Sequence, residues 1–459
     1  MAVTETAPAA LPAAHEGILR RQSLRESAAR TYARSLPIVP VRARGLTIEG
    51  ADGRRYLDCL SGAGTLALGH NHPVVLEAIR KVIDSGAPLH VLDLATPVKD
   101  AFTTELFATL PGELARDARI QFCGPAGTDA VEAAFKLVRA ATGRTGLLAF
   151  TGAYHGMTSG ALDASGGARE VRVTRLPFPQ DYRCPFGTGG ERGAEIAAHW
   201  TQHLLDDPKG GVTAPAGMIL EPVQGEGGVN PAPDAWLRRM REITADRSIP
   251  LIADEVQTGV GRTGRFWAVE HSGVVPDVMV LSKAIGGSLP LAVIVYRSSL
   301  DLWRPGAHAG TFRGNQLAMA AGAATLAYVR ENRLAERAAA LGERMLGRLR
   351  ELAAHHPSIG DVRGRGLMIG VELVDPEAAP AHDGGAPPAD PAFAAAVQQE
   401  CLRRGLIVEL GGRHDAVVRL LPPLTLTDEQ ATAVLDRLAD ALQAAEGSPH
   451  RRAAAGSLR

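Results

Sequence analysis

The sequence is poor in cysteine, in aromatic residues and in unbalanced charge. Its 459 residues include four cysteines with no Cys-x-x-Cys pair, so we expect neither a disulfide framework nor a metal site. Only 4% of the residues are aromatic, which disfavours the stacking surfaces that bind single-stranded nucleic acid. Lys and Arg total 49 against 50 Asp and Glu, so no net charge attracts the chain to nucleic acid or to an anionic membrane.

Long hydrophobic runs are also missing. No stretch of about 18 apolar residues is present, so we expect no transmembrane helix. The first residues, MAVTETAPAALPAAHEG, lack a basic segment followed by an apolar core and do not resemble a secretory signal. Together with free cysteine thiols, this predicts a cytoplasmic protein. Hydrophobic residues still make up 45% of the chain, enough to bury a large core.

Three segments have the composition of irregular structure. Residues 1–17 and 447–459 are Ala-rich and aperiodic, and we predict that they are disordered tails. The stretch 376–391 combines Pro, Ala, Gly and Asp, which predicts an exposed loop inside a folded region.

Short apolar runs alternate with helical patterns between the tails. The runs are nearly continuous in Val, Ile and Leu, as in strands covered on both faces, and helix-periodic segments such as 129–139 separate them. This alternation predicts an α/β fold with a mostly parallel seven-stranded sheet, in a large domain over residues 71–316. The predicted strands are 119–123, 147–150, 171–176, 218–223, 251–256, 278–282 and 291–296.

The pattern changes after Gly314. From there the sequence predicts a smaller α+β domain over 317–446. Residues 18–70 are assigned to the same domain, because the stretch 39–57 is expected to pair with it. The predicted elements of the C-terminal part are a helical segment over 317–350, strands at 367–373 and 406–410, and a last helix over 428–444.

A Gly-rich turn, GPAGTDA at 124–130, lies between a predicted strand and a predicted helix. Glycines let the backbone approach a ligand, and the free N–H groups of the helix favour an anion, so the turn is a candidate phosphate site. An ordinary strand-to-helix turn is the alternative. No Gly-Lys-Ser/Thr follows, which excludes a Walker loop, and the pattern is not the Gly-x-Gly-x-x-Gly of dinucleotide-binding folds.

Two charged residues end buried strands. Asp254, in PLIADEVQTG, either caps a following helix or faces a cation such as a protonated ring nitrogen. Lys283, in VLSKAIGG, is either a solvated lysine or a buried amine whose lowered pKa suits it to bond with an aldehyde. A phosphate turn, a strand-end carboxylate and such a lysine together match the needs of pyridoxal phosphate.

Eight ordered motifs resemble those of the class III, fold-type I, pyridoxal-phosphate aminotransferases. The resemblance runs over about residues 25–438 and implies a large domain with a seven-stranded sheet, a smaller α+β domain and pyridoxal 5′-phosphate as the cofactor. The motifs are GHNHP (69–73), GPAGTDAVEAAFKLVR (124–139), YHG (154–156), EPVQGEGG (221–228), ADEVQTGVGRTG (253–264), LSKAIGG (281–287), GTFRGN (310–315) and RLLPPL (419–424).

The resemblance also implies which residues bind the cofactor. Lys283 would bond to it and shuttle the proton, and Asp254 would pair with the pyridinium nitrogen, so these two are the predicted catalytic residues. Gln257 would touch the 3′-oxygen. Gly127 and Thr128 would bind the phosphate through the helix N-terminus.

Further roles follow from the same resemblance. Tyr154 and Val256 would cover the two faces of the ring. Thr311 would reach the phosphate of the partner subunit, so a homodimer with shared active sites is expected. Glu226 would pair with Arg419 as a gate for the substrate carboxylate. Without the resemblance, core packing or a turn would be the interpretation of Tyr154, Val256 and Thr311.

Within the class, LSGAGTLALGHNHP and HAGTFRGNQLA are most similar to segments of the 2,4-diaminobutyrate–2-oxoglutarate aminotransferases. This similarity implies amino transfer from L-glutamate to L-aspartate 4-semialdehyde, giving L-2,4-diaminobutanoate and 2-oxoglutarate. Met157 and Ala63 depart from relatives of the ornithine and GABA type, which have arginine and tyrosine there. Arg313 is a candidate for the distal carboxylate of glutamate.

Three alternatives stay open at this point. The first is an ornithine-, acetylornithine- or GABA-type aminotransferase. The second is a decarboxylase or aminomutase of the same fold, and the third is an interaction protein that has lost its cofactor.

Overall fold

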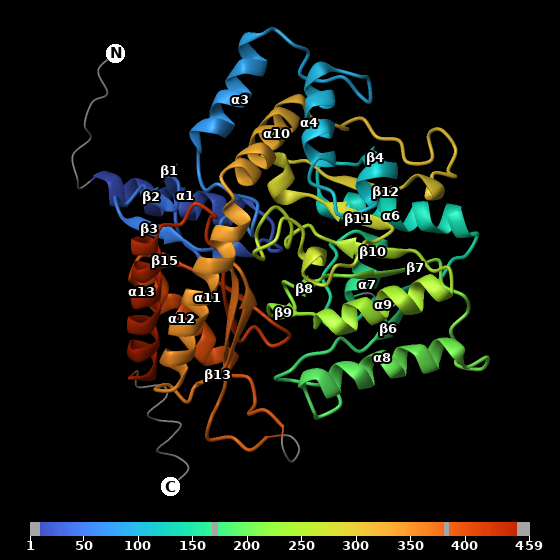
Figure 1. Ribbon diagram of the computed structural model, residues 1–459. Helices are drawn as coiled ribbons and strands as arrows, with labels where there is room; N and C mark the ends of the chain where they lie inside the picture. Colours follow the sequence, from blue (N-terminus) through green and yellow to red (C-terminus); the bar gives the residue numbers. More distant parts are fainter. Residues whose placement is uncertain (1–9, 168–172, 381–384, 448–459) are drawn as a thin grey trace.

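The computed structural model describes residues 10–167, 173–380 and 385–447, and it contains two packed units (Figure 1). The larger unit is built on a seven-stranded sheet with the order β4-β12-β11-β10-β7-β5-β6, in which β12 alone runs antiparallel to its neighbours. Each strand lies within or beside a predicted one. The strands are β4 (Ala118–Phe122), β5 (Leu147–Phe150), β6 (Val173–Leu176), β7 (Gly217–Leu220), β10 (Leu251–Asp254), β11 (Val278–Leu281) and β12 (Val293–Arg297).

Helices cover both faces of this sheet, which explains why its central strands are apolar throughout. Successive residues of β10 point to opposite faces. Ile252 packs into the cluster that contains helix α6 (Gly127–Thr142), whereas Leu251 packs into the cluster that contains α8 (Gly190–Asp206) and α9 (Asp234–Asp246). All four residues of β10 are therefore buried.

The smaller unit contains an antiparallel sheet of order β13-β14-β17-β16 with helices α11, α12 and α13 packed beside it (Figure 1). Its strands are β13 (Ile359–Arg365), β14 (Met368–Leu373), β16 (Glu409–Gly411) and β17 (Val417–Leu420), and its helices are α11 (Leu334–Ala353), α12 (Pro391–Arg403) and α13 (Asp428–Glu446).

The N-terminal strands join this smaller unit. A second sheet has the order β1-β2-β3-β15, in which β3 (Arg55–Asp58) pairs in parallel with β15 (Leu406–Ile407) from the far end of the chain. The predicted pairing of 39–57 with the C-terminal part is therefore confirmed. The two remaining strands of this sheet are β1 (Pro40–Arg44) and β2 (Thr47–Gly50).

The helical segment predicted over 317–350 is two helices. Helix α10 (Gln316–Glu331) ends before Arg333, whose φ of 51° breaks the right-handed helix, and α11 begins at Leu334. Helix α10 packs against α3 (Pro73–Asp84) and α4 (Pro97–Phe107) of the larger unit (Figure 1). The domain division at residues 316/317 stays a prediction.

The N-terminal segment also differs from the expected tail. Helix α1 spans Ala10–Arg25, because its Ala, Leu, Arg and Gln residues favour helix even though none of residues 15–25 is buried. Residues 1–9 of the predicted tail 1–17 lie outside the described residues. So do residues 448–459 of the C-terminal tail, residues 381–384 of the predicted loop and residues 171–172 of the third predicted strand.

Short elements complete the fold. No described helix is both long and apolar enough to cross a bilayer. The remaining elements are α2 (Tyr32–Ser35), α5 (Leu114–Asp117), α7 (Ser159–Ser165), β8 (Val223–Gln224), β9 (Asn230–Pro231) and the 3₁₀ helices η1 (Ala268–His271), η2 (Lys283–Gly286) and η3 (Ser298–Leu300).

Candidate active site

A cavity of about 260 Å³ lies at the carboxyl edge of the parallel strands. Parallel strands end at the same edge of a sheet, so residues that follow them in the sequence meet there. The cavity is lined by residues that follow β4, β5, β7, β10 and β11. They are Ala126, Gly127, Thr128, Tyr154, His155, Gly156, Met157, Glu221, Glu226, Asp254, Val256, Gln257, Thr258 and Lys283.

Lys283 lies in this cavity at the start of η2, two residues after β11 ends. Its φ of 50° places a non-glycine residue in the left-handed region, a strained conformation that is common where function fixes the backbone. Burial is the main cause that lowers the pKa of its amine. The amine is therefore easier to deprotonate than that of an exposed lysine, as a nucleophilic lysine requires.

Asp254 ends β10 and its carboxylate is buried, yet it reaches the cavity. One oxygen, Oδ1, accepts a hydrogen bond from the backbone N–H of Val256 at 3.1 Å, so the predicted capping interaction exists in a turn rather than a helix. The other oxygen lies 2.7 Å from Nδ1 of His155. Both predicted roles of this carboxylate are thus compatible with the geometry.

His155 was not predicted as a site residue, although it lies in the motif YHG. It is buried, which by itself would lower its pKa, but the hydrogen bond and charge of Asp254, together with Glu221, raise the pKa overall. Its Nε2 has no hydrogen-bond partner among the described residues.

The Gly-rich turn opens helix α6, which begins at Gly127. A Cβ atom at Gly127 would lie 3.1 and 3.3 Å from the side chain of Val256, so glycine keeps the first turn of the helix open. The hydroxyl of Thr128 lies 2.6 Å from that of Thr158. Free N–H groups and a hydroxyl at a helix N-terminus form a suitable cradle for phosphate.

Tyr154, Val256 and Gln257 all line the same cavity, as predicted. Gln257 donates a hydrogen bond from Nε2 to the backbone oxygen of Ala63 at 3.3 Å, which places Ala63 beside the site. The Oε1 atom of Gln257 is buried without a hydrogen-bond partner among the described residues.

The predicted pair of Glu226 and Arg419 is present. The guanidinium Nη2 of Arg419 lies 2.9 Å from both carboxylate oxygens of Glu226. The side chain of Arg419 is fully buried, whereas that of Glu226 is 33% exposed. A second carboxylate that the sequence did not single out, Glu409, lies 2.6 Å from the same Nη2. In the sequence, Glu409 is the one acidic residue of the apolar predicted strand 406–410, and this feature could have marked it as a candidate site residue.

Three predicted residues are not among those that line this cavity. Arg419 is the first, and it reaches the cavity only through its contact with Glu226. Thr311 is exposed, and its backbone oxygen lies 3.1 Å from Nε2 of His90. Its role at a partner's phosphate stays a prediction. Arg313 lines a neighbouring cavity with Cys123 and Gly124, so within one chain it does not reach the Lys283 cavity.

Pyridoxal phosphate fits the residues of the Lys283 cavity. The open turn at Gly127 suits its phosphate, the Asp254 carboxylate suits a protonated ring nitrogen, and the unpaired Oε1 of Gln257 can meet a polar ring substituent. No group of three or more His, Cys, Asp or Glu side chains that could hold a metal ion occurs in the described part of the chain.

The fold and this cavity define a fold-type I, pyridoxal-phosphate-dependent enzyme. The family described as "Aminotransferase class-III" matches residues 28–442, and the chain belongs to that family. The resemblance inferred from the eight motifs is therefore confirmed.

Individual relatives cover nearly the whole chain. The diaminobutyrate–2-oxoglutarate aminotransferase of Rhizobium meliloti is 55% identical over 95% of this chain and 93% of its own length. The enzyme of the same name from Haemophilus influenzae is 47% identical over 93% and 95%. A PLP-bound amine transaminase from an uncultivated Pseudomonas species is 30% identical, with a TM-score of 0.79, over 91% of this chain and 97% of its own.

Proposed function

We propose that this chain is a diaminobutyrate–2-oxoglutarate aminotransferase. It transfers the amino group of L-glutamate to L-aspartate 4-semialdehyde and releases L-2,4-diaminobutanoate and 2-oxoglutarate. The observation that carries this proposal is the identity of 55% and 47%, over almost the full length, to two relatives of that name. The complete Lys283–Asp254 cavity argues against an interaction protein that has lost its catalytic residues.

Pyridoxal phosphate supplies an electron sink and a carbon that holds the amino group between the two half-reactions. Lys283 removes a proton from the substrate carbon that carries the amine, and its lowered pKa keeps a larger share of the amine neutral for this task. Asp254 would pair with the ring nitrogen of the bound cofactor, and His155 orients that carboxylate through the 2.7 Å contact.

Gly127 and Thr128 would hold the phosphate of the cofactor at the helix N-terminus, and Tyr154 and Val256 would contact its ring. Glu226 and Arg419 act as a gate. When Glu226 turns away, Arg419 is free to bind the carboxylate of glutamate, and when Glu226 returns, the pocket accepts the end of a substrate that carries no carboxylate.

The proposal includes a homodimer in which Thr311 reaches the partner's phosphate. It is supported by an apolar surface near Thr311. Leu89 and Phe312 line one cavity with His90, which contacts Thr311, and their side chains are 54% and 72% exposed, as is typical of an interface. All four cysteines are free, which supports action in the reducing cytoplasm.

Amino-acceptor profiling tests the proposed substrate. The holoenzyme is supplied with L-glutamate and, in separate reactions, with the semialdehydes of aspartate, glutamate and succinate, while 2-oxoglutarate is measured. Aspartate 4-semialdehyde should give the highest kcat/KM. A higher value for glutamate semialdehyde would favour the ornithine type, one for succinic semialdehyde would favour the GABA type, and release of carbon dioxide without 2-oxoglutarate would indicate a decarboxylase.

A further inference from the structure

Arg419 lies between two carboxylates, not one. Glu226 contacts its Nη2 from the turn that follows β8, and Glu409 contacts the same atom from β16. Residues 409 and 419 are directly opposite one another in the antiparallel pair of β16 and β17, so the sheet register itself brings Glu409 to Arg419. The cluster of these three side chains carries a net charge of −1 when all are ionised.

The two carboxylates differ in their freedom to move. Glu226 lines the cavity and its side chain is 33% exposed, so rotation of its side chain alone can take it away from Arg419. Glu409 is 10% exposed and lies in a hydrogen-bonded strand, so it cannot leave without disturbing the sheet. Glu409 therefore remains beside Arg419 in both positions of the gate.

The side chain of Arg419 also has little room to move. Its guanidinium lies over Gly411, where a Cβ atom would come within 2.7 Å of Nε and 2.9 Å of Cδ. Tyr32 is a fourth side chain in this region. Burial raises the pKa of its phenol, and the charge of Glu409 raises it further. Burial also raises the pKa of Glu409, and the charge of Arg419 opposes that rise, as expected for a buried carboxylate that depends on its arginine.

We propose that Glu409 determines substrate preference by its charge, making the gate cluster net negative and thereby favouring the cationic diamino acid over the dicarboxylate donor. The proposal rests on the proposed function. At neutral pH 2,4-diaminobutanoate carries two ammonium groups and one carboxylate, whereas glutamate carries one ammonium and two carboxylates. The two substrates thus differ by two units of net charge, so one fixed carboxylate near the pocket acts on them in opposite directions.

The test compares the two half-reactions in Glu409→Gln, which removes the charge and keeps the shape. Single-turnover rates are measured separately with L-glutamate and with L-2,4-diaminobutanoate. The ratio of their specificity constants should move toward glutamate by about tenfold or more, because the opposing effects on the two substrates multiply. Glu409→Asp, which keeps the charge, should stay within about threefold of the wild-type ratio.

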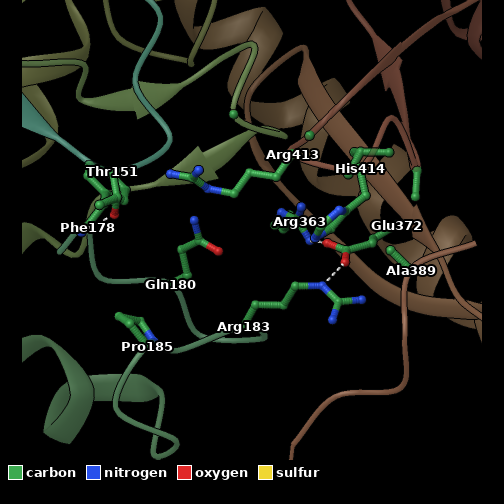
Figure 2. A pocket seen from close by; sticks show the side chains of 14 residues that line it. Thr151, Phe178, Gln180, Arg183, Pro185, Arg363, Glu372, Ala389, Arg413 and His414 are labelled. Carbon is green, nitrogen blue, oxygen red and sulfur yellow. Dashed lines mark hydrogen bonds and ion pairs between the residues drawn. The ribbon is translucent and has the colours of Figure 1, made fainter. Parts of the chain in front are cut away.

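A matched control is Glu372→Gln. Glu372 is a buried carboxylate of the same sheet, held between Arg183 and Arg363, and it lines a different cavity (Figure 2). Its replacement should lower the thermal midpoint without moving the ratio. If Glu409→Gln does not fold, Glu409→Ala is the second charge-removing variant, and it must shift the ratio in the same direction.

Equilibrium binding gives a readout that does not depend on turnover. Glutarate resembles glutamate without the amine, and its affinity for the holoenzyme is measured by calorimetry. It should bind Glu409→Gln several-fold more tightly than the wild type. An unchanged ratio together with unchanged glutarate affinity, or equal losses in both half-reactions, would overturn the role of Glu409. A wild-type enzyme that does not react with diaminobutanoate would instead overturn the proposed function, and glutarate binding would still test Glu409.

Discussion

Lys283 combines three properties at the residue scale: a cavity position, a left-handed backbone and an amine whose pKa is lowered mainly by burial. The negative charges of Glu226 and Asp254 oppose this lowering, whereas the positive charge of Arg419 adds to it. In the proposed mechanism the protonation of the Lys283 amine is therefore coupled to the gate, because the charges of Glu226 and Arg419 also act on the lysine.

Replacing Lys283 by alanine should abolish transamination. The same nitrogen bonds to the cofactor and moves the proton, so we expect turnover to fall by roughly 10⁴-fold or more. The visible absorbance of the lysine-bound cofactor should disappear as well. Steady-state assays and absorption spectra check both expectations, and a variant that kept a tenth of the wild-type turnover would show that another residue performs these tasks.

The gate predicts opposite effects for its two members. Arg419→Ala should weaken the glutamate half-reaction by about 3 kcal/mol, or roughly 100-fold, because a buried charged contact to the carboxylate is lost. The diaminobutanoate half-reaction should suffer much less. Glu226→Ala should keep the use of glutamate and impair the use of diaminobutanoate. Single-turnover measurements of each half-reaction decide this point, and equal losses in both would leave the ion pair with a structural role only.

At the scale of elements, the carboxyl end of β10 carries two acidic residues with different tasks. Asp254 faces the cavity, while Glu255 is buried on the other side and accepts hydrogen bonds from the hydroxyl of Thr258 and the N–H of Val269. Burial raises the pKa of Glu255 to about 7. A carboxyl group whose pKa rises on folding stabilises the native state only while it is protonated.

This pKa predicts a loss of stability as the pH rises. Between pH 4.5, the ordinary pKa of a glutamate, and about 7, the native state holds more protons than the unfolded state, so the free energy of unfolding falls. Glu255→Gln removes this titration. Relative to wild type, the variant should gain about 2–3 kcal/mol between pH 5 and pH 8, as measured by urea unfolding. Glu343→Gln, at an exposed position, is measured alongside as the control for the loss of one carboxylate. Parallel curves for Glu255→Gln and wild type would contradict the raised pKa of Glu255.

At the scale of the whole molecule, the two units meet at the active site. The larger unit supplies the cofactor residues, and the smaller unit supplies Arg419 and Glu409 from β17 and β16. A movement of one unit against the other would therefore change the gate and the cofactor site together. In the proposed homodimer, the exposed apolar side chain of Phe312 would face a second copy of the chain.

Mixing inactive subunits tests the shared site. Subunits with Lys283→Ala are exchanged with subunits that carry Thr311→Ala, and activity is measured at limiting cofactor. If Thr311 serves the partner's phosphate, the mixed dimer has one site with both defects and one intact site, so activity should be partly regained. Failure to regain activity after verified exchange would place Thr311 in its own subunit's site. Unmixed preparations of each variant are the controls.

Local sequence was sufficient for the strands and for the residues at their ends. Continuous apolar runs predict buried strands because only such residues tolerate cover on both faces, and Asp254 and Lys283 meet because parallel strands end at one edge. The break between α10 and α11 was not predictable in this way. It depends on the left-handed backbone of Arg333, and nothing in the apolar period of 317–350 marks that residue.

Only the tertiary structure shows which charged side chains come together in the site. His155 contacts Asp254 because the turn after one strand brings it to the end of another. Glu409 contacts Arg419 because the register of two antiparallel strands places them opposite each other. The sequence determined the fold class and the pairing of Glu226 with Arg419, because each depends on local pattern or on motifs of fixed spacing. The predicted cofactor roles of the residues in the cavity stay predictions. The second carboxylate on the arginine depends on a register between two short strands, and a shift of one residue would have turned Glu409 to the opposite face.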